Sequence, residues 1–348
     1  MPPQEEYQAI LSRAWNEGWI TNRGVLVKEL EEKLKTFLDV PSIIATTNGT
    51  LPLQIAIKAL ALNGEIITTP FSYVATTSSI VWENCVPVFV DIDPEYLTID
   101  ETKIEAAITT KTTAILATHV FGNPCAVEEI ELIANKHNLK VIYDAAHCFG
   151  VKYKGKSIFN YGDVSTCSFH STKIFHTGEG GAIFTKNIEL HQKLFYHHNF
   201  GHKGPEDFYG LGINAKMSEL QAAMGLAVMP YMDYIKKERR KVVDFYNSNL
   251  EELQTIKLRE GTEWNYSYYP VLFANEANVI KVKEALNAIN IYPRRYFYPS
   301  LNLLDYTPEA EMPISENISK RILCLPVYHN LKEEELKLIC ETILKYSK

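Results

Sequence analysis

Short apolar runs alternate with amphipathic helical segments along residues 10–225. Residues 113–118 have the composition of a buried strand, 127–137 the periodicity of a helix, and 139–143 again the composition of a strand. Strands joined through helices run parallel within one sheet. The sequence therefore predicts an α/β fold with a mostly parallel central sheet covered by helices.

A long helix predicted at about 227–250 links this part to a smaller C-terminal one. There, residues 266–273 and 320–325 resemble strands and 333–346 a closing helix, which indicates an α+β arrangement. We predict a large domain over 1–230 with an N-terminal arm, and a small domain over 231–348. The dense basic run 236–241 is interpreted as the solvated face of the linking helix.

Lys173 lies in a glycine-rich loop between two further apolar runs, 164–169 and 182–185. This context excludes the surface of a helix, so we expect the side chain to point into a site. Partial desolvation lowers the pKa of a lysine ammonium, and the neutral amine can then attack a carbonyl to form a Schiff base. Lys173 is the candidate catalytic residue, and pyridoxal phosphate (PLP) is the best-known partner of such a lysine.

A PLP site also needs an acid for the pyridine nitrogen, donors for the phosphate and a flat side chain over the ring. Asp144 follows the apolar run 139–143, at the carboxyl end of a predicted strand, where ligands gather in open α/β sheets. An ionised carboxylate there would keep the pyridine nitrogen protonated. The alternative is that Asp144 caps a helix beginning at Ala145.

Donors for the phosphate are predicted at the junction between residues 43–45 and the helix that follows. Gly49 lets the backbone come close to a ligand, and the free amides of Thr50 and Leu51, with the helix dipole, favour an anion. Ser168 could add a hydroxyl to the same phosphate. The alternative for Ser168 is an ordinary strand serine.

Tyr73, in the loop after the apolar run 65–69, is the candidate for the flat side chain over the ring.

With these parts in place, the chain resembles the sugar aminotransferases of the DegT/DnrJ/EryC1/StrS family, which are fold-type I PLP enzymes, and among them the nucleotide-sugar 4-aminotransferases. The resemblance extends nearly end to end, in blocks that follow the same order: residues 18–21, 48–50, 70–76, 87–93, 119–122, 144–147, 168–181, 212–219 and 325–328.

The resemblance implies a role for each matched residue. Lys173 corresponds to the lysine that binds PLP covalently, Asp144 to the partner of the pyridine nitrogen, and His147 to the residue that reaches the phenolic oxygen. Asn214 matches an asparagine that relatives donate to the phosphate site of the neighbouring subunit, which implies an obligate homodimer with shared active sites. The other matched residues are Gly49, Thr50 and Ser168 at the phosphate and Tyr73 on the ring.

The sequence departs from the family pattern at a few positions. Lys216 stands where many members carry arginine, whose planar fork lysine cannot reproduce. Residues 51–52 replace two small residues, and Pro52 has no amide to donate. His147 replaces glutamine, as in several relatives that aminate C4 of a hexose, and so favours that position. Several residues found upstream in relatives are missing before Met1, which indicates a trimmed start.

The activity implied by the resemblance is transfer of an amino group from L-glutamate to a nucleotide-linked ketosugar. The favoured substrate is dTDP-4-keto-6-deoxyglucose, which would give dTDP-4-amino-4,6-dideoxyglucose for O-antigen or another surface polysaccharide. A 3-keto sugar is the alternative substrate. A sugar dehydratase is a second alternative, although histidine replaces the lysine in such relatives. A non-catalytic relative is a third, against which the retention of Lys173 and Asp144 argues.

Fewer residues are candidates for contact with the substrate, and the sequence patterns that indicate them are less specific. The formal net charge of −7 argues against nonspecific binding to nucleic acid. A nucleotide diphosphate needs only a few cations, and Arg294, beside Arg295, is a candidate together with Tyr296. The alternative there is a pair of arginines in surface salt bridges. His119, at the end of a strand, and Lys216 are further candidates for contact with the substrate.

Neither a membrane span nor a signal peptide is evident, so the chain is predicted to be cytoplasmic. The six cysteines form no CxxC pair or zinc spacing and are interpreted as reduced core residues. The ten histidines lack the companions of a zinc site, so no metal is predicted.

Overall fold

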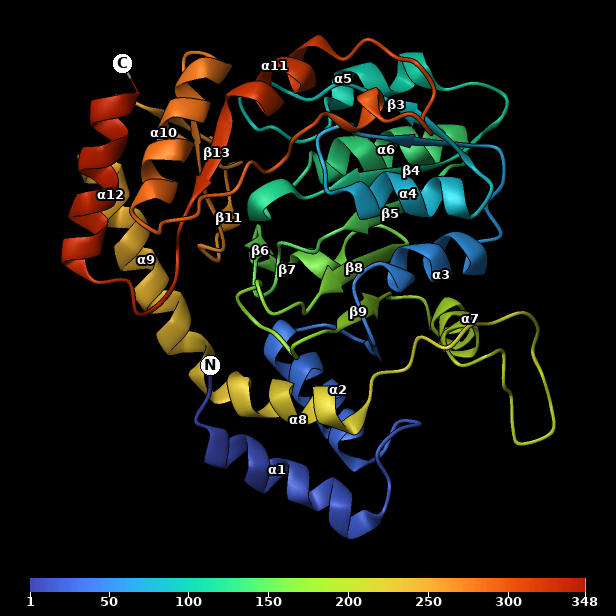
Figure 1. Ribbon diagram of the computed structural model, residues 1–348. Coiled ribbons are helices and arrows are strands. Elements are labelled where there is room, and N and C mark those ends of the chain that lie inside the picture. The colour runs from blue at the N-terminus through green and yellow to red at the C-terminus, as the bar shows by residue number, and fades with distance from the viewer. Residues whose placement is uncertain (348) are drawn as a thin grey trace.

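A seven-stranded sheet forms the centre of the larger part of the molecule in the computed structural model, which describes residues 1–347. Its strand order is β1-β9-β8-β5-β4-β2-β3 (Figure 1). Neighbouring strands from β8 to β3 are parallel, and β9 is antiparallel to both β8 and β1. The predicted α/β fold is confirmed. The strands of this sheet are β1 Ile44–Thr46, β2 Glu65–Thr68, β3 Val86–Phe89, β4 Thr112–Thr118, β5 Lys140–Asp144, β8 Val164–Ser168 and β9 Gly181–Phe184.

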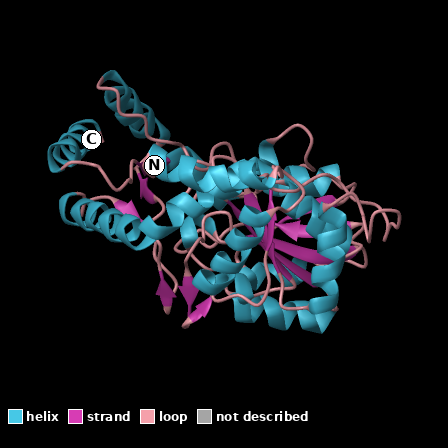
Figure 2. Cartoon of the chain, turned by 90° about the horizontal axis from the view of Figure 1, so that it is seen from below, coloured by secondary structure: helices cyan, strands magenta, loops and turns pink. Residues whose placement is uncertain are grey.

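Helices cover both faces of this sheet (Figure 2). Ile115 and Ala117 of β4 pack in a cluster with side chains of α2, α6 and α8, whereas Ala114 and Leu116 pack with those of α3, α4 and α7. Successive side chains of a strand point to opposite faces, so a strand covered on both sides is apolar throughout. The helices of this part are α1 Gln4–Glu17, α2 Val25–Leu38, α3 Leu51–Ala59, α4 Val74–Trp82, α5 Glu101–Ile104, α6 Val127–His137, α7 Ile188–His198 and α8 Glu219–Val228.

The long helix α9, Met232–Asn249, runs from the part of the molecule around the seven-stranded sheet into the C-terminal part (Figure 1). Met232 and Ile235 pack in the core beneath the large sheet, whereas Val242 and Val243 pack in the C-terminal core. An antiparallel sheet in the order β10-β12-β13 lies in that part, and a third small sheet joins β11 to β6 and β7. The remaining elements are β6 Lys152–Tyr153, β7 Lys156–Ser157, β10 Gln254–Thr255, β11 Thr262–Glu263, β12 Tyr269–Leu272, β13 Ile322–Leu325, α10 Glu276–Ala288, α11 Pro313–Arg321 and α12 Glu333–Tyr346.

Arg239 is an exception within the basic run of α9. It is buried, and its Nη1 donates to the carbonyl oxygens of Tyr266 and Ser267, the latter at 3.1 Å. Position 239 lies on the same helical face as Ile235 and Val242, both of which are core residues. The prediction of a wholly solvated basic face was therefore wrong at this residue, because helical periodicity turns it toward the core.

The six cysteines are buried and unpaired, as predicted. Within residues 1–347, no helix combines the length and apolarity needed to cross a bilayer. The same residues contain no cluster of three or more His, Cys, Asp or Glu side chains placed to hold a metal ion.

Candidate active site

A cavity of about 250 Å³ opens where parallel strands of the large sheet end. The carboxyl ends of parallel strands lie at one edge of a sheet, so residues that follow different strands meet there. Nine of the residues predicted from the sequence line this cavity: Gly49, Thr50, Tyr73, Asp144, His147, Ser168, Lys173, Arg294 and Tyr296.

Lys173 lies in the loop between β8 and β9, where aromatic packing fixes the backbone. Phe175 stacks on Phe149 with ring centroids 4.4 Å apart and meets Phe169 edge to face. The amide of Thr177 donates to the carbonyl of Phe169, which closes the base of the loop. The loop is therefore anchored on both sides of the partly buried Lys173, as the strand–loop–strand pattern predicted.

The amine of Lys173 donates to the hydroxyl of Tyr268 at 3.0 Å. Burial disfavours the ammonium, but Tyr268, Asp144 and Tyr296 together outweigh this effect and raise the pKa of Lys173 above its ordinary value. The expectation of a lowered pKa for Lys173 was wrong. It considered desolvation alone, because the polar partners of Lys173 lie far from it in the sequence. Lys173 must therefore lose a proton before it can attack a carbonyl.

Replacing Tyr268 with phenylalanine should shift the pH at which the Lys173 amine becomes reactive to lower values. The substitution removes a hydrogen-bond acceptor that favours the ammonium. The rate of covalent PLP attachment, measured against pH, checks this. Tyr269→Phe is the matched control, since the Tyr269 hydroxyl donates to Asn247 Oδ1 and not to Lys173. Equal pH profiles for Tyr268→Phe and wild type would contradict the assigned contact.

Asp144 ends β5 and is buried, with two donors on its carboxylate. Thr76 Oγ1 donates to Oδ2 at 2.6 Å, and the amide of Ala146 donates to Oδ1 at 3.1 Å. Burial raises the pKa of Asp144, whereas these hydrogen bonds and the charge of Lys173 oppose the rise. Turns rather than a helix follow Asp144, so the helix-cap alternative is excluded.

His147 is buried in the cavity wall in a neutral form. Its pKa lies well below the ordinary value, because of burial and then the charge of Lys173. The amide of Phe121 donates to Nδ1 at 3.0 Å, so the ring proton lies on Nε2. The ring also packs on Tyr268, with centroids 4.3 Å apart. His147 can therefore act as a hydrogen-bond donor through Nε2.

Gly49 and Ser168 lie in direct contact at the predicted phosphate cradle. A Cβ atom on Gly49 would come within 2.7 Å of the Ser168 Cβ, so no side chain fits there. Asn48 Oδ1 accepts the amides of both Thr50 and Leu51 at 2.9 Å. Leu51 itself does not line the cavity, which corrects its assignment. The side chain of Asn48 caps the first turn of α3, and an anion would have to compete with it for both amides.

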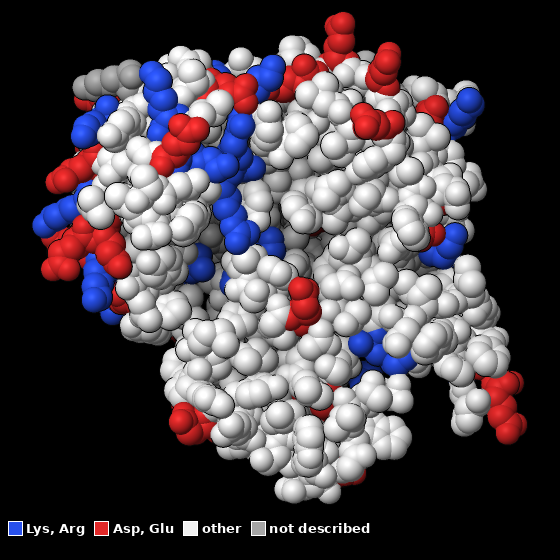
Figure 3. All heavy atoms as spheres, in the orientation of Figure 1, with Lys and Arg blue, Asp and Glu red and all other residues white. Residues whose placement is uncertain are grey.

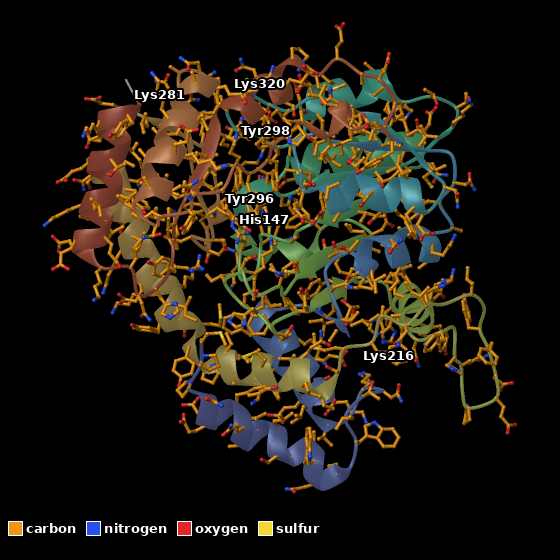
Figure 4. The ribbon with its side chains drawn as sticks, viewed as in Figure 1. His147, Lys216, Lys281, Tyr296, Tyr298 and Lys320 are labelled. Atoms are coloured by element: carbon orange, nitrogen blue, oxygen red, sulfur yellow. The ribbon has the colours of Figure 1, made fainter. Side chains whose placement is uncertain are left out.

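The structure separates the two arginines: the salt-bridge interpretation is confirmed for Arg295, and contact of Arg294 with the substrate stays a prediction. Arg294 lines the cavity, and its Nη1 donates to the Tyr296 hydroxyl at 2.7 Å. Arg295 instead pairs with Glu276 at 2.7 Å and lies over the ring of Tyr298. Figure 3 shows Lys and Arg side chains gathered in the region where Figure 4 labels Tyr296, Tyr298 and Lys320.

Three other predicted residues lie outside the cavity. His119 is fully buried and stacks on Tyr143 at 4.4 Å, since the chain turns inward after β4, so its assignment to the substrate is not supported. Lys216 lies over the ring of Phe200, well apart from His147 and Tyr296 in Figure 4. Asn214 is exposed on the segment between α7 and α8.

Thr76 and Tyr268 are hydrogen-bond partners of two cavity residues, and sequence reasoning missed both. Thr76 holds Asp144, and Tyr268 holds Lys173. Thr76 lies in one of the blocks shared with the family, which is a weak signal for it. Nothing in the local sequence distinguishes Tyr268 from the tyrosines around it.

The residues around the cavity fit PLP. Gly49 places backbone without a side chain at the cavity, Thr50 and Ser168 offer hydroxyls, Asp144 offers a carboxylate, and Lys173 offers an amine. A lysine in the loop before an antiparallel strand and an aspartate at a parallel strand end agree with the class that the family resemblance implied, the fold-type I PLP enzymes.

Comparison with known proteins agrees with this class. The DegT/DnrJ/EryC1/StrS aminotransferase family matches residues 3–344, and the chain belongs to this family. A Shigella dysenteriae protein named dTDP-4-amino-4,6-dideoxy-D-glucose transaminase is 40% identical over 99% of the chain and 96% of its own length. An Escherichia coli protein of the same name is 38% identical over the same shares. The crystal structure of DesI with its TDP-sugar product superimposes with a TM-score of 0.94 at 30% identity, over 100% of this chain and 91% of that one.

Proposed function

We propose that this aminotransferase moves the amino group of L-glutamate to C4 of dTDP-4-keto-6-deoxyglucose and so makes dTDP-4-amino-4,6-dideoxyglucose. The site supports this through the placement of Lys173 and Asp144 on one cavity. The names of the relatives at 40% and 38% identity support the position of the amine and the nucleotide. The replacement of glutamine by His147 also favours C4.

Each side chain of the cavity would have a separate role in such a reaction. PLP, when bound, supplies a carbonyl carbon and a ring that withdraws electrons from the amino-acid carbon. Lys173 would take the proton from Cα of glutamate and later deliver one to C4 of the sugar. Asp144 would hold a proton on the ring nitrogen, and His147 Nε2 would donate to the phenolic oxygen. Gly49, Thr50 and Ser168 would hold the phosphate.

A panel of nucleotide ketosugars tests the proposal. The purified protein is incubated with PLP, glutamate and each sugar, and the products are identified by NMR. We expect 2-oxoglutarate and a 4-amino sugar with the dTDP-4-keto substrate. A 3-amino product would establish the 3-keto alternative, loss of a hydroxyl without a new amine would establish a dehydratase, and no turnover with any sugar would contradict the proposed activity.

Arg294 is a cation at the cavity that suits an anionic substrate. Arg294→Met should raise KM for the nucleotide sugar about tenfold while changing kcat little, because a charge-assisted contact to a phosphate is lost. Arg240→Met, on the exposed side of α9, serves as the control. A fall in kcat with no change in KM would contradict this role for Arg294.

We also propose a homodimer in which each chain completes the other's site. Asn214 lies outside its own cavity, on a segment that projects from the body of the chain between α7 and α8 (Figure 1). That segment exposes several large apolar side chains, which a partner would cover: Phe200, Phe208, Tyr209, Leu211 and Ile213.

A mixing experiment tests the shared site. Light scattering should give twice the mass of one chain. A mixture of Lys173→Ala and Asn214→Ala chains should be more active than either variant alone, since a hybrid dimer holds one intact site. Activity equal to the average of the two variants would argue against sharing.

A further inference from the structure

Three hydroxyl groups form a hydrogen-bonded chain that ends on the Asp144 carboxylate. Thr118 Oγ1 lies 2.9 Å from Ser72 Oγ, which lies 2.7 Å from Thr76 Oγ1, which lies 2.6 Å from Asp144 Oδ2. The four side chains are all buried, with exposed fractions between 0% and 5%. They come from β4, the loop after β2, the first turn of α4 and the end of β5.

The direction of these hydrogen bonds follows from the carboxylate of Asp144, on which the series ends. An ionised carboxylate only accepts hydrogen bonds, so the single hydroxyl proton of Thr76 is committed to Asp144. Thr76 must then accept from Ser72, and Ser72 must accept from Thr118. Such hydrogen bonds polarise one another and strengthen the last donor in the series. With the Ala146 amide on Oδ1, the two oxygens of the carboxylate are held from two sides.

We propose that Thr76 is a positioning residue whose hydroxyl orients the Asp144 carboxylate and keeps it ionised for the pyridine nitrogen of PLP. This inference rests on the proposed function, because it assumes that PLP binds with its nitrogen at Asp144. Thr76 acts through Asp144 and is not itself in contact with the reacting atoms. Thr76 lies in the first turn of α4, directly after Tyr73. One segment therefore carries both the candidate side chain for stacking on the PLP ring and the residue that supports the Asp144 carboxylate.

The adjacent residue offers a matched control. Thr77 is fully buried on the same helix, as Thr76 is, but its Oγ1 has no hydrogen-bond partner among the residues that the structure describes. Replacing either threonine with valine keeps the shape and removes one hydroxyl. A role in packing alone predicts similar effects at both positions, whereas support of Asp144 predicts an effect at Thr76 only.

The test measures the affinity of the full chain for PLP, by absorbance, in four proteins: wild type, Thr76→Val, Thr76→Ser and Thr77→Val. We expect Thr76→Val to bind PLP about tenfold more weakly, as for the loss of a hydrogen bond to a charged group. Thr76→Ser restores the donor and should stay within about threefold of wild type, because a serine hydroxyl can make the same bond. Thr77→Val should match wild type.

The pH dependence gives a second readout. Burial already raises the pKa of Asp144, and loss of the Thr76 donor should raise it further. The affinity for PLP falls as Asp144 becomes protonated, so the decline on the acid side should begin at a higher pH in Thr76→Val than in wild type. Thr77→Val should show the wild-type profile.

Each outcome bears on one proposal. Wild-type affinity and pH profile in Thr76→Val, or equal losses in Thr76→Val and Thr77→Val, would overturn the role of Thr76. If wild type itself bound no PLP, the proposed function would fail instead. Circular dichroism shows whether each variant folds. If Thr76→Val does not, the pair Thr76→Ala and Thr77→Ala carries the same comparison.

Discussion

Replacing Lys173 with alanine should abolish covalent attachment of PLP and reduce transamination at least about 10³-fold, since both the nucleophile and the proton carrier are lost. Borohydride reduction of the PLP-loaded protein, followed by peptide mass spectrometry, measures the first effect. We expect the wild type to carry the added mass on the peptide that contains Lys173. The fold should persist, because the loop is anchored by Phe175 and Phe169 rather than by the lysine.

Lys236 provides the control for this substitution. It is a partly buried lysine of α9 that lines a separate cavity. Lys236→Ala should keep the mass label on the Lys173 peptide and most of the activity. A label on any other side chain in the wild type, or an undiminished label in the Lys173→Ala variant, would remove the basis of the proposed chemistry.

Asp144→Asn should reduce the transamination rate by about 10²- to 10⁴-fold, the range typical of removing a group that controls a proton in the reaction. Asparagine keeps the shape of the side chain and can still accept from the Ala146 amide, but it carries no charge to hold a proton on the ring nitrogen. Steady-state rates with glutamate measure the effect. A rate near that of wild type would show that Asp144 does not serve the ring.

The same substitution should leave the PLP-free protein as stable as wild type or more so. Burial raises the pKa of Asp144 above its ordinary value of 3.8. Between that value and the raised one, the folded chain holds a proton that the unfolded chain releases, so stability falls as the pH rises. Asparagine removes this cost at neutral pH. A thermal melt of the apoprotein at pH 7 checks the sign, and a large loss of Tm would indicate that the carboxylate supports the fold.

The local patterns that predicted residues of the cavity each lie within one short segment. The Lys173 loop, the strand ending at Asp144 and the glycine junction at Gly49 all appear at the cavity. Neighbouring residues along the chain decide whether a strand ends and whether a loop is tight. Such features are therefore legible in sequence, and the family resemblance added the order in which they occur.

One error arises from a near neighbour, and the others arise where a side chain packs against a distant part of the chain. The amides of Thr50 and Leu51 were predicted to be free, but the Asn48 carboxamide folds back onto them. Arg239 was placed on a solvated face, but carbonyl oxygens of the segment before β12 receive it in the core. His119 comes directly after β4, and Asp144 ends β5, yet the His119 ring is buried against Tyr143 and does not line the cavity.

By itself, the sequence determined the α/β sheet, the lysine between two strands and the aspartate at a strand end, because periodicity and turn chemistry act between near neighbours. Tertiary structure alone decided the hydrogen-bond partners of Lys173 and Asp144, and with them the pKa of each group. Tyr268 meets Lys173 across 95 residues, and Thr76 meets Asp144 across 68. Charge and proton position depend on the groups within a few ångströms, and only the folded sheet brings such distant residues that close.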